Sequence, residues 1–223
     1  MTDQIPHTTH GSLRNQVYTQ LRDRIVSGYY TRGTALTEMR VSQELGVSRT
    51  PVREAFSQLH LDGLVRATPN KGIVVEGLDQ NDLLDWYEIR VAMESMAAAK
   101  AAANLTPEVA NELKRTIEEA RQLVEKGMAA DLLKLDARFH DLIFKASGSR
   151  VLQNFLNPIA HYTSQSRQVS LARQTRAEEV IAEHTRILNA MLEHNPQLAR
   201  QEMEQHISHA AASFRMMIAG SPQ

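Results

Sequence analysis

Apolar residues recur at helical spacing through the first third of the chain. Four of them, each four positions after the last, predict an amphipathic helix over residues 12–27: Leu13, Val17, Leu21 and Ile25. The same pattern, with Gly46 and Gly63 as stop signals, predicts two further helices at 38–45 and about 49–62. A short extended turn is expected between the first two helices, at 33–36.

The pattern then changes to two β-prone runs, 64–68 and 72–76. Residues 69–72 between them, Pro-Asn-Lys-Gly, are typical of a hairpin turn. Short helices followed by a hairpin predict a winged helix-turn-helix domain over residues 12–78. The polar segment 1–11 in front of it is expected to be a disordered leader.

After Leu78 no β pattern remains, and the rest of the chain shows only helical periodicity. Low aromatic content, with Ala, Leu, Met and Ile on the inner faces, favours a closely packed helical bundle over residues 79–223. The predicted fold class is therefore mainly α, an N-terminal winged helix-turn-helix plus a C-terminal all-α helical bundle. Six helical segments are expected in the bundle: 79–103, 106–127, 129–147, 150–172, 175–194 and 196–218.

Composition narrows the chemistry that is possible. The chain has no cysteine, so disulfides, thiolate metal ligands and a cysteine nucleophile are excluded, and a reducing cytoplasm is the expected location. Nowhere do about 18 uncharged apolar residues occur in a row, so no membrane partner is expected. The formal net charge is −1, and the slight basic excess before Leu78 is too small to identify a nucleic-acid binder.

Hydrogen-bond donors gather at the start of the helix predicted at about 49–62. A helix that enters the major groove by its N-terminal turn needs such donors for base edges and phosphates. Arg49 and Arg53 are also spaced i,i+4, so they share one face of the helix. The alternative is that the serine caps the helix and the two arginines are solvated surface charges. The four donors are Ser48, Arg49, Thr50 and Arg53.

The stretch Gly46-Val-Ser-Arg-Thr-Pro-Val-Arg-Glu-Ala55, continuing into Leu59 and Asp62-Gly-Leu-Val65, resembles the DNA-binding signature of the GntR family of bacterial transcription regulators. The resemblance implies that Arg49 and Arg53 contact bases or phosphates and that Gly72 lets the wing approach the minor groove. The family often carries arginine at the position of Met39, whereas here the arginine is its neighbour, Arg40, which joins the DNA-binding candidates. A homodimer on double-stranded DNA with a palindromic operator is implied as well.

Four polar residues are predicted to converge inside the bundle. Asp136 and His140 are spaced i,i+4 on an apolar helix face, and His184 and His206 lie on the apolar stripes of two later helices. Three imidazoles and a carboxylate suit a divalent ion such as Zn²⁺, Ni²⁺ or Mn²⁺. The alternative is a set of hydrogen-bonded core histidines. The C-terminal part also resembles the ligand-binding (FCD) domain of the FadR branch of GntR regulators, in which a metal-binding subgroup carries Asp-x-x-x-His, His and His in this order.

Arg90 is the candidate for binding an effector. By resemblance to the FadR branch, an arginine with a glutamate four residues later is implied to meet the carboxylate of a small organic acid. Sequence spacing alone favours an ordinary i,i+4 salt bridge with Glu94 on the helix surface. Both interpretations stay open at this point.

The hypothesis that follows is a homodimeric transcription repressor whose operator binding is controlled by a small organic acid bound near the ion. One alternative is a metal-dependent hydrolase with an attached DNA-binding domain. No HExxH-type helix supports it, and Glu183 is expected to point about 100° around the helix from His184, away from the ion. The other alternative is a dimeric DNA-binding protein with a purely structural C-terminal domain.

Overall fold

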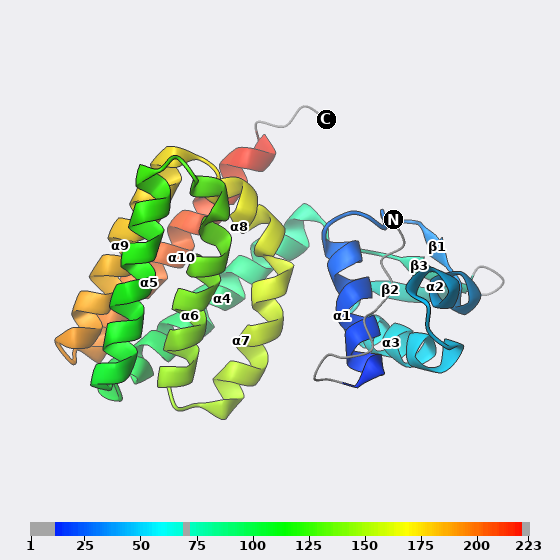
Figure 1. The fold of residues 1–223 in the computed structure, drawn as a ribbon, viewed down its shortest axis with the longest axis horizontal. Helices are drawn as coiled ribbons and strands as arrows, with labels where there is room; N and C mark the ends of the chain where they lie inside the picture. Colours follow the sequence, from blue (N-terminus) through cyan, green and yellow to red (C-terminus); the bar gives the residue numbers. More distant parts are fainter. Residues whose placement is uncertain (1–11, 69–71, 220–223) are drawn as a thin grey trace. The chain divides into compact units, whose positions relative to one another are not determined.

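The computed structural model describes residues 12–68 and 72–219 (Figure 1). The expected leader, 1–11, and most of the expected hairpin turn, 69–71, lie outside the described residues. The chain divides into two compact units, Met1–Asp79 and Gln80–Gln223. A mainly α fold, with a helix-turn-helix unit followed by an all-helical unit, is confirmed.

The first unit combines three helices with a small antiparallel sheet (Figure 1). The strand order is β1-β3-β2, so β3 lies between a short partner and a longer one. Ala35 of β1 pairs with Val74, and Val65 of β2 pairs with Val75. The elements are α1 (Leu13–Val26), β1 (Ala35–Leu36), α2 (Glu38–Leu45), α3 (Arg49–Leu61), β2 (Val65–Thr68) and β3 (Gly72–Val75).

Local chemistry explains where these helices begin and end. The hydroxyl of Thr37 accepts a hydrogen bond from the backbone N–H of Arg40, which starts α2. Gly46 ends α2 in the left-handed conformation, at φ 68°, and so turns the chain toward α3. Ser48 holds the N-cap position of α3, but its side chain makes no capping hydrogen bond. The backbone N–H groups at the start of α3 therefore receive no help from that hydroxyl.

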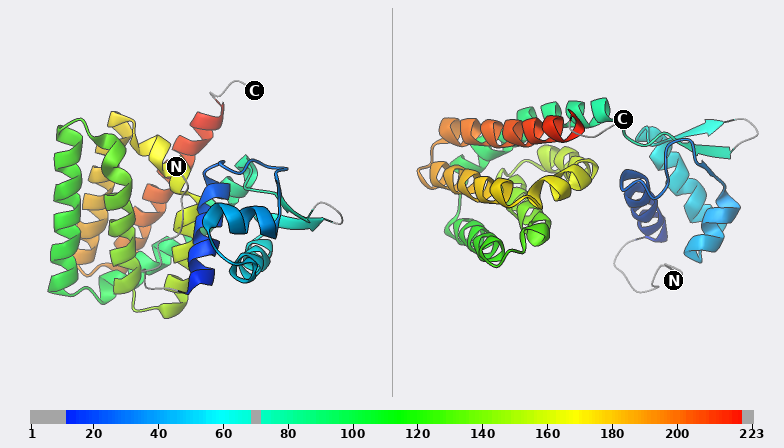
Figure 2. Two further views of the ribbon diagram at one scale, coloured as in Figure 1. Left: turned by 45° about the vertical axis from the view of Figure 1, so that its right-hand side comes forward. Right: turned by 90° about the horizontal axis from the view of Figure 1, so that it is seen from above.

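The second unit is a bundle in which α4 lies beside α10, while α9 lies between α10 and α5 (Figure 2). Its helices are α4 (Gln80–Ala103), α5 (Pro107–Glu125), α6 (Leu132–Ala146), α7 (Arg150–Tyr162), α8 (Ser164–Leu171), α9 (Gln174–Leu192) and α10 (Pro196–Ala219). A short 3-10 turn, η1 (Ala129–Asp131), precedes α6. No helix in the described part of the chain is both long enough and apolar enough to cross a membrane.

The expectation of one helix over 150–172 was wrong. The helix breaks at Thr163, where φ −93° and ψ 1° depart from helical values, and the hydroxyl of Thr163 bonds to the carbonyl oxygen of Ile159. Pro158, inside α7, also lacks the N–H that a continuous helix would use. The break creates α8, a separate short helix.

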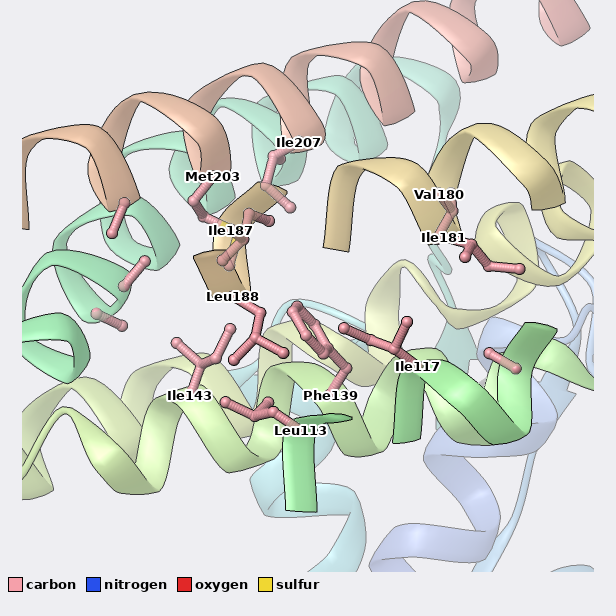
Figure 3. Close-up of a cluster of buried hydrophobic side chains, with 14 of the residues drawn as sticks. Leu113, Ile117, Phe139, Ile143, Val180, Ile181, Ile187, Leu188, Met203 and Ile207 are labelled. Atoms are coloured by element: carbon pink, nitrogen blue, oxygen red, sulfur yellow. The ribbon is translucent and has the colours of Figure 1, made fainter. Parts of the chain in front are cut away.

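The interior of the bundle is apolar and closely packed (Figure 3). Phe139 of α6 lies among aliphatic side chains from α5 and α9, with Met203 and Ile207 of α10 completing the cluster. Into this interior the helices also bring ionisable side chains, from positions neighbouring Phe139 and Ile207 in the sequence. The apolar packing therefore surrounds the polar centre described next.

Candidate metal centre and DNA-binding surface

The four residues predicted to converge do lie together. Asp136 and His140 come from α6, His184 from α9 and His206 from α10, and all four are buried. Each offers one potential ligand atom, and these atoms all lie within 4.8 Å of one another. Two ligand atoms bonded at about 2.0–2.2 Å to one ion lie at most about 4.4 Å apart, so only a small inward adjustment would bring these four atoms to one ion.

Two of the imidazoles, His206 and His140, have a carboxylate beside the Nδ1 atom, on the side of the ring away from the other histidine. Nδ1 of His206 donates to Oε2 of Glu183 at 2.7 Å, and Nδ1 of His140 lies 2.6 Å from Oε2 of Glu94, close to it but off the hydrogen-bond direction. This leaves the two Nε2 atoms facing each other at 3.2 Å. In neutral rings protonated at Nδ1, both Nε2 atoms are acceptors, so a cation between them would replace repulsion by coordination.

His184 supplies the observation that best supports a metal ion. Its Nε2 atom is buried and has no hydrogen-bond partner among the described residues, and it lies 3.5 Å from Oδ1 of Asp136. The ring is held by stacking on Phe139, with centroids 3.8 Å apart. A buried nitrogen without a partner destabilises a protein by about 1–3 kcal/mol, and an ion at this point would satisfy it.

The ionisation states also suit coordination. Burial lowers the pKa of His184 and of His206, with a further lowering from neighbouring histidines, so both rings favour the neutral form that binds metals. Burial alone would raise the pKa of Asp136, but Arg167 and the histidines outweigh it and hold that pKa well below its usual range. The donor set of one carboxylate and three imidazoles therefore fits a divalent ion.

Sequence reasoning missed two members of this centre, Arg167 and Glu183. The Arg167 guanidinium, on α8, contacts Oδ2 of Asp136. The sequence predicted one continuous helix over 150–172, and that prediction did not place Arg167 on a buried face. Glu183 was expected to point away from the ion, yet it is buried and also accepts hydrogen bonds from Arg176 at 2.8 and 2.9 Å. The i,i+7 spacing of Arg176 and Glu183 is the signal that could have found this pair.

Arg90 lies in the interior and not on the helix surface. Its Nε donates to Oε1 of Glu94 at 2.5 Å, so the expected pair forms, but both side chains are almost completely buried. Nη1 of Arg90 is buried without a hydrogen-bond partner among the described residues. A cavity of about 20 Å³ lies here, and its lining includes Arg90, Asp136, Arg167 and His206. This nitrogen is therefore an unused hydrogen-bond donor beside the polar centre.

The six DNA-binding candidates are all exposed: Arg40, Ser48, Arg49, Thr50, Arg53 and Gly72. Arg49, Arg53 and Gly72 also line one open hollow of about 870 Å³ between α2, α3 and the sheet. Nε of Arg53 donates to Oε1 of Glu38 at 2.9 Å, which ties this arginine to the start of α2.

The local structure requires a glycine at position 72. Its φ is +75°, and a Cβ there would lie 3.1 Å from the carbonyl oxygen of Leu36 in β1. A side chain at this position would therefore strain the backbone and press on the edge strand. This requirement holds whether or not the residue also approaches DNA.

Both units match families of known proteins. Residues 13–75 match the family model described as bacterial regulatory proteins, gntR family, and residues 85–209 match the FCD domain. The protein belongs to the GntR family of bacterial regulators, and its second unit is an FCD domain. It is therefore a DNA-binding transcription regulator with an effector-binding domain, which sets the hydrolase alternative aside.

Relatives along nearly the whole chain are transcription regulators. An uncharacterized HTH-type regulator of Bacillus subtilis, YdhC, is 29% identical over 195 residues, which are 87% of each chain. The HTH-type transcriptional repressor RspR of Escherichia coli is 27% identical over 205 residues, 92% of this chain and 90% of its own. Among solved structures, Escherichia coli McbR/YncC matches with a TM-score of 0.75 at 23% identity, over 94% of this chain and all of its own, and shares the fold.

Replacing His184 by alanine should remove the ion. We expect wild-type protein to carry about one divalent ion per chain and His184→Ala to carry far less after desalting, measured by plasma mass spectrometry. The melting temperature should fall with it, because the ion links α6, α9 and α10. His161→Ala, an exposed histidine on α7, is the matched control. Full metal content in His184→Ala would place the ion elsewhere.

Replacing Glu183 by glutamine should weaken metal binding without removing a ligand. The neutral amide accepts more weakly from Nδ1 of His206, so we expect the dissociation constant for Zn²⁺ to rise about 10–100-fold in competition titrations with a chelator. Glu179→Gln, an exposed partner of Arg176, is the control and should leave the constant unchanged. Equal constants for Glu183→Gln and wild type would show that Glu183 does not support the ion.

Proposed function

We propose that this protein is a homodimeric repressor whose binding to a palindromic operator is controlled by a small carboxylate bound beside a divalent ion. One observation carries the proposal: Arg90, whose buried Nη1 has no hydrogen-bond partner among the described residues, lines the same small cavity as the candidate ligands Asp136 and His206. A cation with an unused donor beside a metal centre is suited to hold a carboxylate. The repressor names of relatives such as RspR support the sign of regulation.

Residues 12–78 would form the DNA-binding domain, and residues 79–223 the domain for effector binding and dimerisation. In the second domain, Asp136, His140, His184 and His206 would hold Zn²⁺, Ni²⁺ or Mn²⁺. The ion, when bound, supplies a Lewis-acidic position for one carboxylate oxygen. Glu94 and Glu183 keep two of the imidazoles turned so that Nε2 faces the centre.

Arg90 would bind the effector through Nη1 of its guanidinium. Glu94 accepts from its Nε and so fixes the guanidinium while leaving Nη1 for the ligand. Glu94 also lies next to His140, so one carboxylate links the effector arginine to a metal ligand. A shift of Arg90 on effector binding would therefore alter the surroundings of His140.

The chain itself offers a route from the effector to DNA. The helix that carries Arg90 and Glu94, α4, starts at Gln80, a few residues after β3 ends at Val75. A shift of α4 on ligand binding is transmitted through this short connection to the DNA-binding unit. Different affinities of the effector for the two arrangements would supply the coupling free energy.

The DNA-binding surface is proposed to centre on the start of α3. Arg49 and Arg53 would contact bases or phosphates, with Ser48 and Thr50 as further donors at the N-terminus of the helix. Arg40 would contact DNA from α2, and Gly72 would allow the wing to approach the minor groove.

Removing the arginines of α3 should weaken operator binding. Arg49→Ala or Arg53→Ala should each weaken binding to an operator selected from random duplexes by about 1–3 kcal/mol, because base or phosphate contacts are lost. Fluorescence anisotropy at fixed salt measures this. Arg121→Ala, an exposed arginine of α5, should bind as wild type. Full-strength binding by the Arg49/Arg53 double variant would contradict the assignment of α3.

Replacing Arg90 should uncouple the effector from DNA. With a panel of two- to six-carbon hydroxy and dicarboxylic acids, we expect an acid that releases operator from wild type to have little effect on Arg90→Gln. Operator binding without acid and metal content should both survive. If the second unit were purely structural, no acid in the panel would change operator binding by either protein.

A further inference from the structure

One exposed apolar side chain lies on the surface that carries the DNA-binding candidates. Met39, in the first turn of α2, is 54% exposed. It lines the open hollow between α2, α3 and the sheet, together with Arg49 and Arg53 of α3. This position distinguishes Met39 from apolar residues that are exposed singly elsewhere, which are common on protein surfaces. The other exposed large apolar residues in the described part of the first unit do not line the hollow: Leu13, Tyr29 and Leu61.

The start of α2 is held beside the start of α3. Nε of Arg53 donates to Oε1 of Glu38 at 2.9 Å, and Glu38 directly precedes Met39 in α2. The hydroxyl of Thr37 caps α2 by accepting a backbone hydrogen bond, which fixes the turn that carries Met39. A duplex that contacts both Arg49 and Arg53 would therefore lie next to Met39.

The hollow has apolar side chains as well as arginines. Leu36, Phe56 and Ile73 line it with Met39, and of these four only Met39 is exposed. The arginines attract the phosphates of a duplex, but an exposed apolar side chain gains nothing from a phosphate. It is stabilised only by an apolar group of the ligand that removes it from water.

The major groove of DNA offers such a group at one base. Each base edge there presents hydrogen-bond donors and acceptors, and thymine adds its C5 methyl group. Methionine has no donor and only a weakly accepting sulfur, so it cannot form the paired hydrogen bonds by which arginine reads guanine and asparagine or glutamine reads adenine. Contact between methionine and a thymine methyl group removes two apolar surfaces from water and is specific for sequence.

We propose that Met39 is a specificity-determining residue that contacts the C5 methyl group of a thymine in the operator half-site. This inference rests on the proposed DNA-binding surface and deepens it, because arginine reads guanine or phosphate, whereas Met39 reads thymine. Bound DNA covers the exposed part of Met39. The contact therefore adds to discrimination between sequences without adding to the attraction for phosphates.

Removing single methyl groups from the DNA tests the contact. An operator is selected from random duplexes by the full-length protein, and each thymine of one half-site is replaced in turn by 2′-deoxyuridine, which lacks only the methyl group. Fluorescence anisotropy at fixed salt gives the dissociation constants. At one thymine we expect the wild-type constant to rise about two- to fivefold, the loss that corresponds to one buried methyl group. The same replacement should leave the constant of Met39→Ala unchanged.

Two further variants separate a base contact from a general loss of binding. Met39→Leu keeps an apolar side chain and should still respond to deoxyuridine. Leu61→Ala, at an exposed position of α3 outside the hollow, should behave as wild type throughout. Met39→Ala should weaken operator binding but keep the wild-type slope of affinity against salt concentration, because no phosphate contact is lost. All three variants should melt at the wild-type temperature, since both side chains are exposed.

If no replacement by deoxyuridine weakens wild-type binding, the inference is overturned. An equal loss at the same thymine in wild type and in Met39→Ala would overturn it as well, since another residue would then contact the methyl group. In both cases the assignment of α3 stands if Arg49→Ala and Arg53→Ala weaken operator binding. Full-strength binding by the Arg49/Arg53 double variant would remove the proposed DNA-binding surface, and the inference would fall with it.

Discussion

Burial of ionisable groups inside an all-helical bundle is the constraint on which the rest of this structure depends. A charge or imidazole in such an interior is tolerated only where an opposite charge or a hydrogen bond meets it. Here the helices α4, α6, α8, α9 and α10 each contribute at least one such group, and contacts such as Arg167 with Asp136 and His206 with Glu183 join different helices. The polar centre therefore contributes, together with the apolar core around Phe139, to how these helices pack.

The DNA-binding unit and the FCD domain place their polar side chains in different surroundings. The DNA-binding unit keeps its candidate arginines, Arg49 and Arg53, exposed, and long-range attraction and phosphate contacts act on exposed charges. The FCD domain instead buries its candidate metal ligands and Arg90, and electrostatic contacts are stronger in such an interior than in water. The start of α4 joins the two units. The chain therefore combines strong, local contacts in the buried centre of the FCD domain with weaker, distributed contacts on the exposed surface of the DNA-binding unit.

Much of this organisation could be predicted from sequence, because helical periodicity and stop signals such as Gly46 act locally. The same periodicity put Asp136, His140, His184 and His206 on inward faces. It could not show which buried groups meet across helices, because the partners of Asp136 and His206 depend on tertiary packing. Arg167 was missed since the break at Thr163 arises from one backbone conformation, and Glu183 was missed since its burial depends on Arg176.

The donor set of the centre contains only oxygen and nitrogen, in a chain without a single cysteine. Thiolate sites change with the oxidation state of their surroundings, because sulfur forms disulfides and sulfenic acids. Imidazole and carboxylate ligands do not undergo this chemistry under the same conditions. An ion held by these residues would therefore keep its ligands when the surroundings become oxidising, and regulation through such an ion would persist under oxidative stress.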